Sequence, residues 1–404
     1  MTHFYNNFNK MDRNLIHFKS SISDTSNMPK KTLLLLLPIT TLILYVFYIC
    51  LTLNQTSQNI TIIELDSNNQ NTTTSTKSTK TEEKPNEIAC LTIKTNETLP
   101  DISNFPPNKN KRNIFFMETS CKSHDKGKLF LKARQACAVE SAANMNPATD
   151  VYLLITSPGV FKDENTESDR IIKALQKYSN IKLMYYNVER FVQGSPVEPL
   201  WKSGRVKASN YPLAHISDVL RLLVLWKYGG IYLDLDIVVI KNLDTLPTNF
   251  AGAETSDVLA SGVMGYDAEG TGHQFLTKCL NDLNEHFDGV LWAANGPLLI
   301  TRNIMARCPD KQAKDVISSG HCEDFYIMST PSFYPIHWSE WYKYFDPNLL
   351  TTIENEIDAK SYLIHVWNKL SVDKLIPKNQ TEVPYLHVAK RYCPEVVKQL
   401  DEYF

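Results

Sequence analysis

Two aspartates, Asp234 and Asp236, are embedded in a strongly apolar stretch, GGIYLDLDIVVI (229–240). The surrounding Ile, Leu, Tyr and Val residues are those that a buried β-strand uses. On a strand, positions i and i+2 project from one face, so the two carboxylates would lie side by side. Two like charges in a core are costly unless a positive group neutralises them. Carboxylate oxygens are hard ligands, so the pair favours a Mg²⁺, Mn²⁺ or Ca²⁺ site.

The alternative explanation of this pair is two surface acids on an edge strand, because Asp-x-Asp also occurs by chance. The flanking residues are too apolar for an exposed edge. We therefore expect the positive partner to be a metal ion. An Asp-x-Asp pair at the end of a strand, able to hold a metal against a diphosphate, resembles the DxD arrangement of nucleotide-sugar transferases.

The segment just before this pair, SDVLRLLVLWKYGG (217–230), predicts an apolar helix. Ser217 is a good N-cap, which would make Asp218 the first helical residue, and Gly229 is a typical C-terminal stop. Asp218 and Arg221 are three apart and share one helix face. A local ion pair is the simpler explanation. An acid and an arginine kept on an otherwise buried helix favour contact with a polar ligand instead.

The elements that must position these residues follow a regular rhythm from residue 113 onward. Apolar runs at 113–120, 150–157 and 181–191 alternate with helical patterns at 132–145 and 168–180. This alternation predicts an α/β domain with a mostly parallel central sheet, in which ligands bind at the carboxyl ends of the strands. Farther on, we expect helices at 272–287 and from Gly296, and a strand at 360–367. Residues 113–404 are predicted to form one catalytic domain.

The N-terminal part of the 404-residue chain is organised differently. Residues 32–53 are uncharged and long enough to cross a bilayer as a helix. Basic residues precede this stretch, so residues 1–31 are predicted to be cytoplasmic and the rest luminal, in a type II topology. A cleaved signal peptide is the alternative, disfavoured by the long N-terminal region and the lack of a clear cleavage site. The net charge of −2 and the pI of 6.6 give no indication of nucleic-acid binding.

Residues 54–112 are poor in large apolar side chains and contain NTTTSTKSTKTEEKPNE, which predicts a disordered luminal stem. N-glycosylation sequons support luminal exposure; they begin at Asn54, Asn59, Asn71, Asn96 and Asn379. Seven cysteines follow the membrane segment, an odd number that leaves at least one thiol outside intrachain pairs. Their spacing does not suit metal binding, so disulfides are expected, with Cys308–Cys322 the first candidate.

The stretch SDVLRLLVLWKYGGIYLDLD (217–236) resembles a signature shared by yeast-type α-mannosyltransferases and glucosylating clostridial toxins. Six further motifs are similar to those of the animal α1,4-glycosyltransferases: METS (117–120), CAVESAA (137–143), NGPLLITR (295–302), FYPIHW (333–338), HVWNK (365–369) and RYCP (391–394). The resemblance runs in order over 113–400. It implies a GT-A-type nucleotide-sugar transferase fold.

The resemblance also implies roles for individual residues. Asp234 and Asp236 would bind Mn²⁺ and, through it, the diphosphate of the donor. Asp218 and Arg221 would hold the hydroxyls of the donor sugar. His365 would add a metal or phosphate contact, although a lone histidine can equally be a core residue. The other expected donor-binding residues are Trp367, Asn368 and Lys369, which follow His365, and Glu118, Thr119 and Ser120, where uridine is expected.

This resemblance implies a Golgi-membrane enzyme that moves galactose or N-acetylgalactosamine from a UDP-sugar to a glycosphingolipid, forming an α1,4 bond with retention. Asn295 stands in NGP where the galactosyltransferases carry QGP, and we expect its amide to stabilise the reacting sugar from the β face. Two alternatives are α1,4-N-acetylglucosamine transfer to glycoprotein O-glycans and a catalytically silent glycan-binding protein on the same fold.

Overall fold

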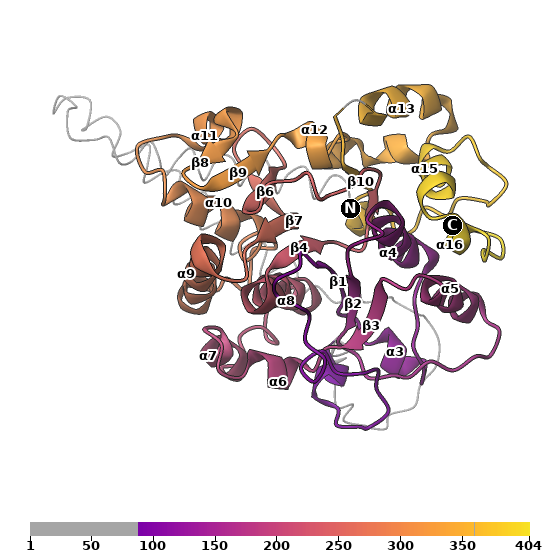
Figure 1. Ribbon diagram of the computed structural model, residues 1–404, viewed down its shortest axis with the longest axis horizontal. Helices are drawn as coiled ribbons and strands as arrows, with labels where there is room; N and C mark the ends of the chain where they lie inside the picture. The colour runs from indigo at the N-terminus through magenta and orange to yellow at the C-terminus, as the bar shows by residue number, and fades with distance from the viewer. Residues whose placement is uncertain (1–87, 359) are drawn as a thin grey trace, which may run out of the picture. The chain divides into compact units, whose positions relative to one another are not determined.

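The computed structural model describes residues 88–358 and 360–404 (Figure 1). Its first half alternates strands and helices as predicted: β1 (Ile114–Glu118), α4 (Ala133–Met145), β2 (Val151–Ile155), α5 (Glu167–Gln176), β3 (Ile181–Tyr185), α8 (Pro212–Tyr228) and β4 (Gly230–Leu233). Strands β3, β2, β1 and β4 are neighbours in that order, and each pair runs parallel. Their carboxyl ends therefore meet at one edge of the sheet.

The complete sheet has eight strands in the order β3-β2-β1-β4-β7-β6-β9-β8. Its second half comprises β6 (Phe250–Ala253), β7 (Leu259–Tyr266), β8 (His321–Cys322) and β9 (Phe325–Met328). Strand β7 runs antiparallel to both β4 and β6, and β8 runs antiparallel to β9. The sheet is therefore mixed, and the prediction of a mostly parallel sheet holds for its first half only. The reason is local: β6 and β7 are joined by a turn too short for a parallel crossover.

A second sheet pairs β5 (Ile237–Val239) with β10 (Leu363–His365) in antiparallel register, with Ile237 opposite His365. The predicted continuous strand over 231–240 is thus two strands that belong to different sheets. Between them the chain turns at Asp234–Asp236, where the Ile237 amide donates to the Asp234 carbonyl at 3.2 Å. The same-face argument for the two aspartates is wrong in its premise, because they lie in a turn and not on a strand.

Helices cover both faces of the large sheet (Figure 1). On one face, α8 packs with α9 (Gly270–His286) and α10 (Pro297–Met305); on the other, α4 and α5 pack with α15 (Pro384–Tyr392) and α16 (Pro394–Val397). Neighbouring residues of β1 point to opposite faces, so Phe115 belongs to the first core and Phe116 to the second. This two-sided burial explains why the parallel strands read as continuous apolar runs.

Shorter elements complete the described part of the chain: η2 (Ala89–Thr92), α3 (Lys122–Asp125), α6 (Val188–Val192), α7 (Glu198–Lys202), α11 (Ala313–Ser319), α12 (Thr330–Phe333), η3 (Trp338–Phe345), η4 (Pro347–Leu349), α13 (Leu350–Asp358) and α14 (Asn368–Ser371). None of the helices in residues 88–358 and 360–404 has the length and apolar character needed to span a membrane. The predicted anchor at 32–53 and the tail at 1–31 lie outside the described residues.

Part of the segment assigned to the stem packs against the folded domain. Ile88, Leu91 and Ile102 are buried in the same core as α8. The Ile102 amide donates to the Tyr185 carbonyl at 3.0 Å, which covers the edge of β3, and a disulfide joins Cys90 to Cys121. Residues 88–112 therefore belong to the folded unit, so the predicted boundary at 112 is too late. The segment needs few apolar residues to stay packed, because the Cys90–Cys121 disulfide and the pairing with the edge of β3 also hold it in place.

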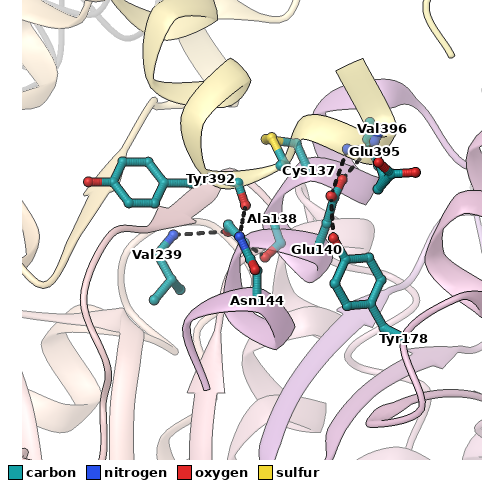
Figure 2. Close-up of a disulfide and its surroundings, with 11 residues drawn as sticks. Cys137, Ala138, Glu140, Asn144, Tyr178, Val239, Tyr392, Glu395 and Val396 are labelled. Atoms are coloured by element: carbon teal, nitrogen blue, oxygen red, sulfur yellow. Dashed lines mark hydrogen bonds between the residues drawn. A yellow bond between two sulfur atoms is a disulfide. The ribbon is translucent and has the colours of Figure 1, made fainter. Parts of the chain in front are cut away.

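The disulfide predicted between Cys308 and Cys322 is present, and Cys279 is a buried free thiol. The third bridge, Cys137–Cys393, connects α4 to the segment that begins α16 (Figure 2). Next to it, the buried Glu140 accepts hydrogen bonds from the Tyr178 hydroxyl and from the first amides of α16. The C-terminal helices are thereby fixed to the helix that covers β1 and β2.

Candidate active site

Asp234 and Asp236 occupy the turn that follows the carboxyl end of β4. The Tyr232 hydroxyl donates to Oδ1 of Asp234 at 2.8 Å. The Asn368 amide donates to Oδ2 of Asp236 at 2.8 Å, and the Val366 amide donates to the Asp236 carbonyl at 3.0 Å. Both carboxylates are thus oriented by residues that the sheets bring close.

His365, the last residue of β10, completes a cluster with the two aspartates. Its Nε2 lies 3.2 Å from Oδ1 of Asp236 and 3.9 Å from Oδ2 of Asp234. One ligand atom from each of the three residues lies within 4.8 Å of the others, a spacing at which they can hold a metal ion. Carboxylate and imidazole groups are both ligands for divalent cations. A Cβ at Gly262 would come within 2.8 Å of the Asp234 carboxylate, so the glycine keeps this space open.

Asp218 and Arg221 lie in the middle of α8, one turn apart. The helix begins at Pro212 and not at Ser217, so the predicted position at the helix N-terminus is wrong, whereas the predicted end at Gly229 is confirmed. Proline fits the first turn of a helix, and this signal outweighs the N-cap preference of Ser217. Both side chains are still directed into the site, with Nη2 of Arg221 3.6 Å from Oδ1 of Asp218.

The Arg221 guanidinium is held on several sides. It donates to the Ser217 hydroxyl at 2.9 Å and to the Ser261 carbonyl of β7 at 3.0 Å. Its Nη1 lies 3.1 Å from Oδ1 of Asp234, which links α8 to the turn. The Tyr232 ring lies beneath it, 4.9 Å from the guanidinium carbon. These contacts fix a cation between Asp218 and Asp234, as a planar five-donor group allows.

Burial and charge set the titration of these groups. Burial, helped by Asp234 and opposed by Arg221, raises the pKa of Asp218 to about 7. Burial disfavours ionised Asp234, but Arg221 and His365 outweigh it and lower its pKa. Burial also raises the pKa of Asp236, with only partial relief from His365. Burial disfavours protonated His365, but Asp236 and Asp234 outweigh it and raise the pKa of the imidazole. In the state with all three carboxylates ionised and His365 neutral, the site, with Arg221 included, has two net negative charges, which one divalent cation would balance.

Asn295 lies at the start of the segment that leads into α10, and its amide makes two hydrogen bonds with the backbone of Asp288. The Asp288 amide donates to its Oδ1 at 3.1 Å, and its Nδ2 donates to the Asp288 carbonyl at 2.6 Å. The residue therefore closes the loop over 288–295. The neighbouring Gly296 comes closer to the other site residues, because a Cβ there would lie 2.6 Å from Oδ1 of Asp218.

The remaining predicted residues occupy two places. Glu118 ends β1, accepts from the Ser120 amide at 2.7 Å and also pairs with the Gln135 side chain; Thr119 is buried beside it. Trp367 adopts a left-handed conformation, with φ of 55°, and its indole donates to the Ile336 carbonyl at 2.9 Å. This turn delivers the Asn368 amide to Asp236, while Lys369 points to solvent. The Asn368 Oδ1 is buried and has no partner among the described residues.

Several residues that surround the site were not predicted to belong to it: Ser217, Tyr232, Glu254, Ser261, Gly262 and Tyr334. Glu254 follows β6; burial raises its pKa and the nearby His365 lowers it. Tyr334 is buried beside His365, with the ring centroids 5.6 Å apart. For Tyr334 a signal existed, because FYPIHW was among the motifs that carried the resemblance. For β7 the signal was weak: a Ser-Gly pair inside an apolar strand.

Comparison with known proteins agrees with this geometry. A family model described as "Glycosyltransferase sugar-binding region containing DXD motif" matches residues 132–251, which include the Asp234–Asp236 turn. A second, "Alpha 1,4-glycosyltransferase conserved region", matches residues 268–400. Lactosylceramide 4-alpha-galactosyltransferase from Mus musculus is 32% identical over 304 residues, 74% of this chain and 79% of its own length. The protein from Pan troglodytes with the same name is 30% identical over 321 residues, 79% of this chain and 84% of its own length.

The chain belongs to the animal α1,4-glycosyltransferase family. This α1,4-glycosyltransferase is also 27% identical over 291 residues to alpha-1,4-N-acetylglucosaminyltransferase from Homo sapiens, covering 69% of this chain and 82% of that protein. Among solved structures, PaToxG glycosyltransferase aligns over 70% of this chain and 87% of its own, with a TM-score of 0.37 and 12% identity. Galactosyltransferase LgtC, in complex with donor and acceptor sugar analogs, aligns over 71% and 95%, with a TM-score of 0.31 and 14% identity. The family assignment makes the protein a hexosyltransferase.

Proposed function

We propose that this α1,4-glycosyltransferase moves galactose or N-acetylgalactosamine from a UDP-sugar to the terminal sugar of a glycosphingolipid. The observation that carries the proposal is the convergence of Asp218 and Arg221 of α8 on the Asp234–Asp236–His365 cluster. Relatives at about 30% identity whose names specify lactosylceramide and galactose support this donor and acceptor class. The fold on which the site is built is proposed to be of the GT-A type.

We propose that separate groups of residues bind the diphosphate and the sugar of the donor. Asp234, Asp236 and His365 would hold Mn²⁺ against the diphosphate, and when bound the cation supplies positive charge that stabilises the leaving UDP. Asp218 and Arg221 would bind the hydroxyls of the sugar. Arg221 suits this role because Ser217 and Ser261 already fix its guanidinium. Glu118, Thr119 and Ser120 at the end of β1 are proposed to bind the uridine. Trp367, Asn368 and Lys369, in the turn after His365, are proposed as further donor contacts.

The stereochemistry follows from the bonds involved. An α-linked UDP-sugar that gives an α1,4 product reacts with retention at C1. Asp218 and Asp234 contact Arg221, Asp236 contacts His365, and the amide oxygen of Asn295 already accepts from Asp288. We favour front-face transfer, in which the C1–O bond to diphosphate breaks, the acceptor O4–C1 bond forms, and the departing diphosphate takes the acceptor proton. A glycosyl adduct on Asp218, Glu254 or another carboxylate, trapped without acceptor and detected by mass spectrometry, would overturn this mechanism.

The cellular setting is part of the proposal. Disulfides between cysteines of the described domain fit an oxidising compartment. The uncharged stretch at 32–53 and the basic residues before it favour a single-pass type II anchor in the Golgi membrane, with the catalytic domain luminal.

The test is a donor and acceptor screen with the full chain purified in detergent. UDP-galactose, UDP-N-acetylgalactosamine and UDP-N-acetylglucosamine are each offered with lactosylceramide and with an O-glycan acceptor, in Mn²⁺. Transfer of galactose or N-acetylgalactosamine to the lipid is the expected result. Exclusive transfer of N-acetylglucosamine to the O-glycan would favour the activity in the name of the human relative at 27% identity. If the wild-type chain transfers no sugar with any donor and acceptor pair, and so gives the same result as the inactive control Asp236→Asn, the proposed function is contradicted.

A further inference from the structure

Tyr334 lies next to the candidate metal ligand His365, and no hydrogen bond among the described residues accounts for its hydroxyl. It follows α12 and is only 2% exposed. Its ring centroid lies 5.6 Å from that of His365 and 5.5 Å from that of Trp367. On another side, a Cβ added at Gly252 would come within 3.1 Å of Cε2 of the ring. The ring is therefore held tightly between β6 and β10, at the carboxylate cluster.

The hydroxyl of Tyr334 is buried and has no hydrogen-bond partner among the described residues. A buried polar group without a partner costs free energy, and phenylalanine would fill the same space without that cost. Four other tyrosines share this feature: Tyr186 and Tyr266 belong to the core around α8 and α9, and Tyr344 and Tyr385 belong to the same core as Tyr334. Tyr334 differs from these four in its ring contact with His365, a candidate metal ligand, and the charges of Glu254, Asp234, Arg221 and Asp236 all act on it. Its position, together with the missing partner, points to a ligand.

The carboxylates of the site do not accept a hydrogen bond from the Tyr334 hydroxyl. Asp234 accepts from Tyr232 and Arg221, and Asp236 accepts from the Asn368 amide and lies next to His365. A phenol keeps its proton at neutral pH and so acts as a hydrogen-bond donor. The group that remains for it is an anionic oxygen that arrives with the substrate. A diphosphate bound at this cluster would bring such oxygens.

We propose that the Tyr334 hydroxyl donates a hydrogen bond to a phosphate oxygen of the bound nucleoside diphosphate and thereby positions the leaving group. The inference rests on the proposed function, since it requires a UDP-sugar at the Asp234–Asp236–His365 cluster. A hydrogen bond from a neutral donor to a charged acceptor is stronger than one between neutral groups. The hydroxyl thus contributes to holding the diphosphate, while its ring packs against His365 and Trp367.

The experiment compares wild type, Tyr334→Phe and the matched control Tyr266→Phe as full chains in detergent. Calorimetry gives the affinity for UDP with Mn²⁺, and ligand-observed NMR gives the affinity for uridine, which lacks the phosphates. For Tyr334→Phe we expect UDP affinity to fall roughly 10- to 100-fold, as for loss of one hydrogen bond to a charged group. Uridine affinity and the unfolding midpoint should stay at or above wild-type values. Tyr266→Phe should bind both ligands like wild type.

Equal UDP affinity in Tyr334→Phe and wild type would overturn the inference. So would a parallel loss of UDP and uridine affinity, because that pattern indicates general loosening of the site. Failure of the proposed function looks different: the wild-type protein itself would neither bind UDP with Mn²⁺ nor transfer sugar.

Discussion

Nη1 of Arg221 lies 3.1 Å from Oδ1 of Asp234, so a guanidinium from α8 directly neutralises the first aspartate of the DxD turn. From the sequence, the expected positive partner of the two acids was a metal ion alone. In the structure, two side chains share this neutralisation: Arg221 pairs with Asp234, and His365 lies next to Asp236. When all three carboxylates are ionised and His365 is neutral, two net negative charges remain for a divalent cation. Arg221 thus connects the sugar-binding side of the proposed site, at Asp218, with its metal-binding side.

Replacement of Arg221 by alanine is predicted to damage both stability and activity. The change leaves the buried Asp218 and the partly exposed Asp234 without their cation. Removing one partner of a buried ion pair typically costs about 3–5 kcal/mol, which is the upper limit here. Denaturant unfolding of the metal-free protein measures this loss. Mn²⁺ should restore part of the stability but not the transfer activity. Arg221→Lys is the control, since it keeps the charge but cannot reach Ser217, Ser261 and Asp234 together. Wild-type stability and turnover in Arg221→Ala would contradict this view of the pair.

Replacement of Asp236 by asparagine should separate metal binding from folding. The side chain keeps an oxygen that can accept from the Asn368 amide, and the change relieves repulsion between neighbouring acids. We expect transfer to be lost and Mn²⁺ affinity to fall, while the unfolding midpoint of the metal-free protein stays equal or rises. Titration with Mn²⁺ followed by calorimetry measures the affinity. Full activity of the wild-type enzyme in excess chelator would remove the basis for a metal role.

Much of the fold was predictable because its signals are local. The apolar runs of β1, β2 and β3 and the helical patterns of α4 and α5 appear where the sequence placed them. The break at Asp234–Asp236 was not predictable from local pattern. The flanking residues read as one strand, and only the pairing of β5 with β10, far along the chain, separates β5 from β4.

The site shows the same division. The three aspartates, Arg221 and His365 were predicted because their residue types suit the chemistry and their spacing matches known motifs, and the structure brings them together. Ser261 and Gly262 were missed, because they reach Arg221 and Asp234 through the pairing of β7 with β4. Asn295 was predicted to stabilise the reacting sugar, and the structure adds hydrogen bonds between its amide and the backbone of Asp288, which the sequence did not indicate. A loop-closing hydrogen bond of this kind depends on loop geometry, which residue type does not reveal.

The stability of the metal-free protein should fall as pH rises through the range in which Asp218 titrates. Its folded-state pKa of about 7 lies above the ordinary value near 3.9, so the folded state binds the proton more tightly than the unfolded chain does. The contribution is therefore fully present below about pH 4 and is lost between about pH 4 and 7. Its upper limit is on the order of 4 kcal/mol. Asp218→Asn should flatten this part of the profile, measured by denaturant unfolding at successive pH values. Parallel profiles for both proteins would exclude Asp218 as the source.

Glu140 is predicted to stabilise the packing of α16 against α4 (Figure 2). Its carboxylate accepts from the Tyr178 hydroxyl at 2.7 Å and from the Glu395 and Val396 amides at 2.8 and 2.7 Å. Glutamine has one acceptor oxygen, so Glu140→Gln leaves a buried donor unpaired at a cost of roughly 1–3 kcal/mol. Glu395→Gln is the matched control; it changes surface ion pairs and should cost less than about 1 kcal/mol. Equal destabilisation by the two changes would disagree with this assignment.

The proposed luminal topology predicts N-linked glycans on the protein expressed in animal cells. Asn96 and Asn379 begin sequons and are both exposed, as glycan attachment requires. Asn54, Asn59 and Asn71 lie closer to the proposed anchor, outside the described residues. Digestion with peptide N-glycosidase should therefore increase the gel mobility of the full chain, and Asn379→Gln should remove one step of the shift. Placing the same domain behind a cytosolic leader, without the stretch at 32–53, supplies the unglycosylated control. If peptide N-glycosidase leaves the gel mobility of the full chain unchanged, residues 54–404 do not enter the lumen, and the proposed type II topology fails.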